Sequence, residues 1–66
     1  METILIMARA LEKSSGADVE RLDIQHNEIN DTYYGHLHLV KMDSEGNLLV
    51  ALKYHISENG SVMKED

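Results

Sequence analysis

The 66-residue chain contains no cysteine, proline, tryptophan or phenylalanine, and only three tyrosines. Without cysteine, disulfide bonds and thiolate metal sites are excluded. The core must therefore come from aliphatic side chains, methionine and tyrosine, and aliphatic side chains are smaller anchors than aromatic ones. A chain of this length also buries only about 60% of the surface that it exposes when unfolded. We therefore expect one small domain over residues 1–66 that covers further apolar surface by forming a homodimer.

Basic residues are also scarce: six Lys and Arg stand against twelve Asp and Glu, for a formal net charge of -6. Affinity for nucleic acid comes largely from Lys and Arg at phosphates, so direct nucleic-acid binding is not expected. An acidic protein can instead mimic nucleic acid and fill a basic groove, although the acids here are dispersed rather than clustered. No run of apolar residues is long enough to cross a membrane, and no signal sequence is recognisable, so we expect a cytoplasmic protein.

An apolar stripe predicts a helix over residues 3–14. The stripe consists of Ile4, Met7, Ala8 and Leu11. Gly16 suits the left-handed position that follows a helix. The competing interpretation is a strand, because residues 3–6 are rich in β-branched side chains. Ile6 and Ala10 lie away from the stripe, so the apolar surface is wider than one sheet covers, which again favours a second copy.

Residues 17–30 fit two patterns. Leu22, Ile24 and His26 alternate as in a strand, whereas Val19, Leu22 and His26 also fit a helical spacing. We favour a strand over residues 19–26, because a lone two-stranded hairpin is only marginally stable and a third strand would support it.

The clearest element is a β-hairpin from Tyr33 to Ile56, with strands over residues 33–42 and 48–56. Asp43 to Asn47 supply the turn, and Gly46 provides the positive φ that a tight turn needs. Gly35, inside the first strand, indicates a bulge or a close backbone approach.

A second turn signal, Asn59-Gly60, precedes a short last strand over residues 61–64. The predicted fold class is therefore α+β, with one N-terminal helix followed by a three- to four-stranded antiparallel β-meander. Small bacterial and phage accessory proteins share this outline, which is an analogy of size and composition only.

Three histidines, His36, His38 and His55, form the one constellation that could carry chemistry. If Glu45 and Gly46 alone form the loop, His36 lies opposite His55 and all three imidazoles share a face, as in some zinc sites. If residues 44–46 form the loop, the register slips by one residue and the cluster disperses. The uniform apolar face that the first register produces favours it slightly, but histidines on an exposed sheet face are more often solvated than ligands.

No other pattern predicts a site. Asp43-x-Glu45-x-Asn47 has the spacing of a calcium loop but lacks the glycine and glutamate that complete one. The serines lie in predicted turns, and no phosphate-binding glycine-rich loop is present. We therefore predict no enzyme activity, no catalytic, cofactor-binding or metal-ligating residue and no cofactor. The expected function is a protein-interaction or regulatory module, the alternatives being a metal- or ligand-binding protein that uses the histidines and an acidic nucleic-acid mimic.

Overall fold

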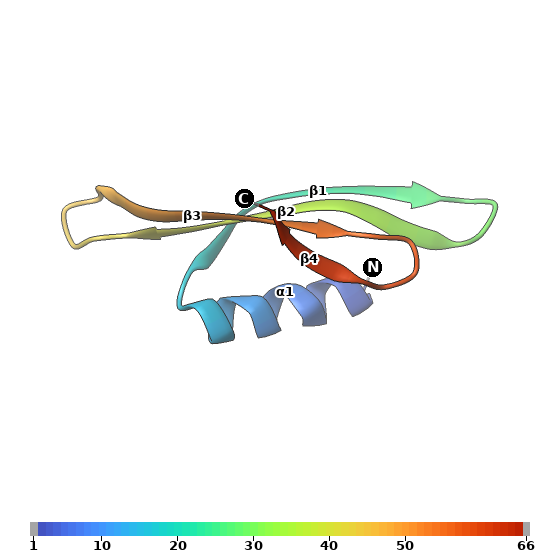
Figure 1. Cartoon of the computed structure of the whole chain (residues 1–66), viewed down its shortest axis with the longest axis horizontal. Helices are drawn as coiled ribbons and strands as arrows, with labels where there is room; N and C mark the ends of the chain where they lie inside the picture. Colours follow the sequence, from blue (N-terminus) through green and yellow to red (C-terminus); the bar gives the residue numbers. More distant parts are fainter. Residues whose placement is uncertain (1, 66) are drawn as a thin grey trace.

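The computed structural model describes residues 2–65 of the chain. It consists of one helix followed by four strands (Figure 1). These elements are α1 (Glu2–Ser15), β1 (Asp18–Asn27), β2 (Thr32–Met42), β3 (Leu48–Ile56) and β4 (Val62–Glu65). The strands form one antiparallel sheet in the order β1-β2-β3-β4. The predicted α+β class, with a helix before an antiparallel meander, is confirmed, and residues 18–27 form a strand rather than a helix.

Hydrogen bonds tie the end of α1 to the start of β1. Gly16 has a φ of 74°, and its N–H donates to the Glu12 carbonyl at 2.9 Å, which closes the helix as such glycines do. The Glu12 carboxylate accepts the Val19 N–H at 2.9 Å. This bond, followed by the one from Arg9, holds the pKa of Glu12 below its usual value. The chain therefore reverses within two residues and lays α1 back across the sheet.

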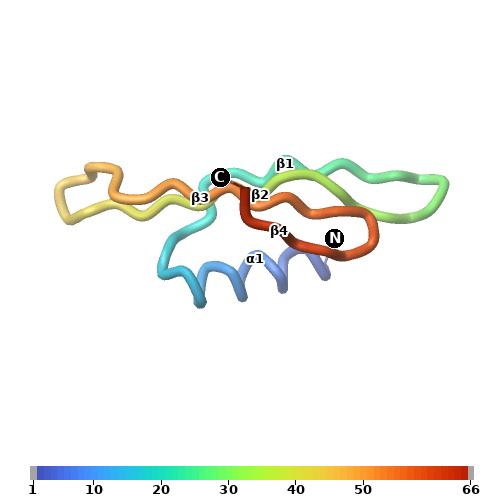
Figure 2. Tube along the Cα trace, viewed as in Figure 1, coloured from blue at the N-terminus to red at the C-terminus, as the bar shows by residue number. Residues whose placement is uncertain are grey.

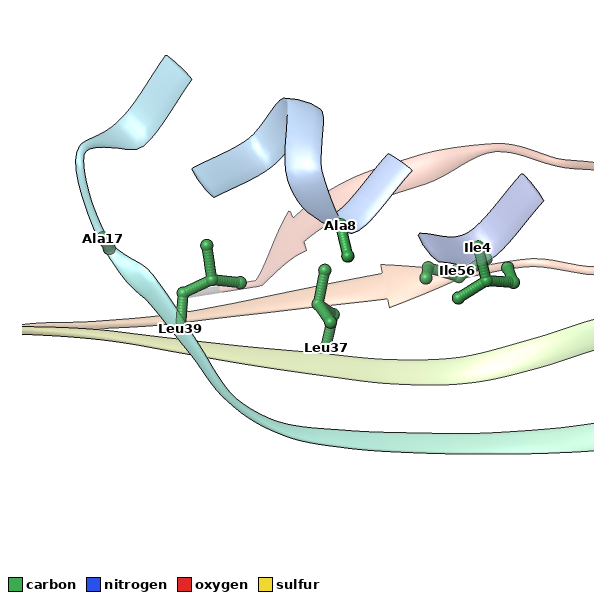
Figure 3. Packing of buried hydrophobic residues seen from close by; sticks show 6 residues of the cluster. All are labelled: Ile4, Ala8, Ala17, Leu37, Leu39 and Ile56. Atoms are coloured by element: carbon green, nitrogen blue, oxygen red, sulfur yellow. The ribbon is translucent and has the colours of Figure 1, made fainter. Parts of the chain in front are cut away.

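The core is a single small layer between α1 and one face of the sheet (Figure 3). Six hydrophobic side chains are buried in it: Ile4, Ala8, Ala17, Leu37, Leu39 and Ile56. Leu37 and Leu39 of β2 are completely buried, because both point to the same face at alternating positions and α1 covers that face. The opposite face of the sheet, which we call the open face, carries no helix among residues 2–65.

The sheet is much longer than its helix. Fourteen residues of helix extend about 21 Å, whereas the molecule is 45 Å along its longest axis. Both long hairpins therefore project beyond the ends of α1, as the chain trace shows (Figure 2). The β2–β3 turn extends past the C-terminal end of α1, and the β1–β2 turn extends past its N-terminal end. Within residues 2–65, no helix has the length and apolar character needed to cross a membrane.

Candidate functional site

The pairing of β2 with β3 places the three histidines on one face. His36 lies directly opposite His55, and Val40 lies opposite Ala51. This is the pairing that a two-residue loop would give. Because the neighbours of His36 and His38 in β2 are the buried core leucines, the histidines belong to the open face.

The turn itself has the other predicted form. Asp43 N–H donates to Asn47 O at 2.9 Å, which leaves residues 44–46 as a three-residue loop. The register is then restored by a bulge, because Lys41 pairs with Val50 while Met42 pairs with Leu48. Leu49 is the extra residue. The sequence-based link between a three-residue loop and dispersed histidines was therefore wrong, because a bulge next to the turn compensates for the extra loop residue.

The imidazoles are close neighbours but do not converge on one point. The ring centroids of His36 and His55 are 5.2 Å apart, and those of His36 and His38 are 6.4 Å apart. His36 Nε2 lies 3.0 Å from a carboxylate oxygen of Glu65, at the far edge of the sheet. Across residues 2–65, no group of three or more histidine and carboxylate side chains is placed to hold a metal ion. The predicted cluster thus exists as a row of side chains rather than as a coordination site.

His38 faces two partners of opposite charge. Its Nε2 is 3.3 Å from Arg21 Nη2 and 3.3 Å from Asp23 Oδ2. Arg21 also donates through Nε to Asp23 Oδ2 at 2.8 Å. An unprotonated Nε2 accepts from Arg21, and a protonated Nε2 donates to Asp23, so the contact persists whichever tautomer is present. These side chains form a polar network on the open face beside β1.

His26, the fourth histidine, lies on the other face of the sheet. Its Nε2 is 2.8 Å from Asp31 Oδ1, and its ring stacks on Tyr33 with centroids 4.5 Å apart. Tyr33 packs against the core cluster. His26 is therefore separated from the other histidines by the sheet and contributes to the packing at one end of α1.

The calcium-like spacing in the β2–β3 turn serves the turn itself. Asp43 Oδ1 accepts the N–H groups of Glu45 and Asn47, each at 2.9 Å. The bond from the Asn47 N–H is the main cause that holds the pKa of Asp43 below its usual value, with the Glu45 N–H adding to it. The carboxylate is already engaged by backbone donors, as an Asx-type turn requires.

A group of exposed apolar side chains occupies the projecting end of the β2–β3 hairpin. We call it the apolar hairpin end, and it comprises Met42, Leu48, Leu49 and Val50, which are 53%, 57%, 58% and 41% exposed. Alternation in the sequence puts Leu48 and Val50 together on the core face. In the structure, the bulge at Leu49 pairs Leu48 with Met42, which lies on the open face because it alternates with Lys41 and the buried Leu39. Val50 stays on the helix side, and its exposure follows from length, since a helix of this size cannot cover a nine-residue strand to its end.

Two hollows of similar size open on the surface of residues 2–65. One, of about 330 Å³, adjoins the apolar hairpin end and includes Leu48, Val40 and Ala51 in its lining, with Lys53 and Glu65 nearby. The other, of about 260 Å³, lies between the start of α1 and the β3–β4 turn and includes Met7 and Tyr33. Both are at or below the lower end of the 300–1,000 Å³ range typical of small-molecule sites.

Comparison of the chain with protein-family models, curated proteins and solved structures finds no match.

Proposed function

We propose that this chain is a small regulatory module that acts in the cytoplasm by binding another protein, has no catalytic activity of its own and works as a homodimer. The main evidence for binding of another protein is the apolar hairpin end. Its four large apolar side chains are neighbours in the β2–β3 pairing and each is at least 41% exposed, with Met42 and Leu48 on the open face. The hairpin end that carries them projects past α1 (Figure 1). Contiguous apolar patches with a polar rim mark interaction surfaces in soluble proteins.

The hollow beside the apolar hairpin end supports the same function. It shares Leu48 with that surface and offers about 330 Å³, enough for one large side chain of a partner. Interfaces concentrate their energy in such pockets, which receive an aromatic or aliphatic anchor. Lys53 and Glu65 provide a polar rim on the same hollow. The partner that fits is therefore a protein segment with one apolar anchor flanked by apolar contacts.

Two further features support the homodimer. Only six hydrophobic side chains are buried in the described chain. On α1, Leu5 and Ile6 remain 50% and 64% exposed. A second copy that covered part of this surface would add the burial that a single small core does not supply.

Affinity capture with paired surface variants tests whether the apolar hairpin end binds another protein. In the test variant, Leu48 and Leu49 are both replaced by Asp. In the control, Ile29→Asp changes a side chain that is 94% exposed in the opposite turn. Any protein retained from host extract by the wild type and by the control should be lost with the test variant. Equal retention by all three proteins would refute the assignment of this surface.

Light scattering during size-exclusion chromatography tests the dimer. The expected mass is twice that of the 7.5 kDa chain. A monomer mass at the highest attainable concentration would refute the homodimer without bearing on the hairpin surface.

A further inference from the structure

β1 is an edge strand whose outer side pairs with no other part of residues 2–65. Ten residues of strand therefore present a row of N–H and C=O groups that another strand can pair with. The pairing with β2 is interrupted by a bulge at Glu20 and is regular from Arg21 to Asn27. We propose that two copies of this chain join through antiparallel pairing of their β1 strands, with Leu22 opposite Leu22 of the second copy. This proposal rests on the homodimer proposed above and names its surface.

Two charged side chains select this register. Arg21 and Asp23 both lie on the open face and are exposed, at 61% and 49%. With Leu22 on the two-fold axis, Arg21 of each copy lies opposite Asp23 of the other. The two nearest symmetric registers place Arg21 opposite Arg21 or Asp23 opposite Asp23, and like charges directly opposite one another destabilise a sheet. Registers shifted further leave both charges without an opposite partner.

The apolar side chains fit the same arrangement. Leu22 and Ile24, on the helix side of β1, are only half-buried at the open edge. Leu5 lies two helical turns from Glu12, and Glu12 bonds to Val19 of β1, so Leu5 occupies the flank of α1 that faces this edge. Two-fold pairing keeps both helices on one side of the joined sheet, with these flanks turned toward each other.

The spacing of the two helices leaves room for these side chains. α1 lies over β2, whose Leu37 and Leu39 are completely buried, while the core-side residues of β1 are half-buried. Neighbouring strands are about 4.8 Å apart, so the helices of a joined sheet lie three strand spacings, or about 14 Å, from each other. This exceeds the distance at which helices pack directly, so the space between them is occupied by Leu5, Leu22 and Ile24 of both copies. Ile6, on the outer side of α1, would stay exposed.

A charge-exchange series tests the register. Arg21→Asp and Asp23→Arg each create two like-charge pairs across the axis, so each single variant should weaken dimerisation by about tenfold or more. The double variant exchanges both charges, restores opposite pairs within and between copies, and should return to within about twofold of the wild type. Sedimentation equilibrium supplies the dissociation constants, and circular dichroism confirms that all the variants are folded.

Cross-linking adds a geometric readout, because the chain has no cysteine of its own. Leu22→Cys places two thiols directly opposite each other on the axis and should form a disulfide-linked dimer in mild oxidant. Ile24→Cys lies on the same strand and face, but its two copies are about 13 Å apart along the strands. That separation exceeds the reach of a disulfide, so this variant should stay uncross-linked.

The outcomes distinguish the failure of the β1 interface from the failure of the homodimer. If the wild type is a monomer, both proposals are refuted. A wild-type dimer that is unaffected by either charge change, or that cross-links equally through residues 22 and 24, overturns the β1 interface alone and leaves another surface to form the dimer.

Discussion

Replacing Gly35 by alanine should remove a large part of the stability of this protein, although the change adds only one carbon atom. Gly35 lies in the middle of β2 opposite Ile24, with a φ of 149°. A Cβ built there would lie 2.0 Å from the carbonyl oxygen of Asp23 and 3.0 Å from its carbonyl carbon. Both atoms belong to the backbone of β1, so no side-chain rotation relieves the overlap. Of the two readings of Gly35 from the sequence, a bulge or a close approach, the structure shows the close approach.

The free-energy cost of Gly35→Ala follows from the strand separation that it requires. A C···O contact is normally about 3.3 Å or longer, so β1 and β2 must separate locally by more than about 1 Å. The unfavourable φ costs about 1–3 kcal/mol, and each weakened ladder hydrogen bond about 1 kcal/mol more. A total of about 4 kcal/mol is comparable with the whole stability of a 66-residue domain, about 3–10 kcal/mol.

Gly46→Ala is the matched control, since Gly46 also has a positive φ, 84°, but no atom lies within 4 Å of its added Cβ. Gly46→Ala should lower the free energy of unfolding only by the strain of a left-handed alanine, about 1–2 kcal/mol. The melting temperature should then fall by about 5–15 °C. Thermal unfolding followed by far-ultraviolet circular dichroism compares the two. If Gly35→Ala melted as high as Gly46→Ala, the close approach of β1 and β2 at this point would be refuted.

Three further predictions use the turn, the histidines and the core. The lowered pKa of Asp43 means that its stabilising effect is complete above its unfolded pKa and is lost as pH falls through the folded value. Asp43→Asn should therefore lose less stability than the wild type between about pH 5 and about pH 2 in urea titrations, and an equal loss would contradict the role of the turn hydrogen bonds. Zinc titrated into the wild type should give no calorimetric heat beyond that of dilution, because no group of side chains in residues 2–65 is placed to hold a metal ion. The His36→Ala variant is the control, and a binding isotherm seen with the wild type alone would support the metal hypothesis instead. Leu37→Ala removes a completely buried side chain and should lower the unfolding free energy by about 2–5 kcal/mol in urea, and a smaller loss would show that the core relaxes around the gap.

Alternation and turn chemistry were sufficient to predict most elements of this fold. The last three strands follow from period-two patterns and from Gly and Asn turn signals, and the helix follows from one apolar stripe. Residues 18–27 illustrate the limit of local pattern, because they fit a helix and a strand equally well. Only the need to support the hairpin pointed to a strand, and the pairing of β1 with β2 along nine residue pairs supplies that support.

The histidine site was harder to predict because two local features shift the β2–β3 register in opposite directions. The loop of residues 44–46 shifts the register by one residue, and the bulge at Leu49 shifts it back. The sequence allows the three-residue loop as one of two alternatives, but it gives no sign of the bulge, since leucine at a bulge has no distinctive pattern. The three histidines therefore share a face because of the bulge, which the turn residues alone do not predict. Exposure of the apolar hairpin end depends on the same bulge, which puts Leu48 beside Met42 on the open face, and on the length of α1 relative to the sheet, which leaves Val50 uncovered.

The two proposed surfaces are compatible within one molecule. Antiparallel pairing of β1 relates the copies by a two-fold axis perpendicular to the joined sheet, so their β2–β3 hairpins point in opposite directions. In each copy the apolar hairpin end lies near the beginning of β1, away from an axis at Leu22. Both binding surfaces therefore stay accessible, one at each end of an eight-stranded sheet. Such a dimer is bivalent, and a partner that is itself dimeric or repeated would be held with higher avidity than a single small apolar patch provides. Self-association would then contribute to partner binding as well as to the stability of a small core.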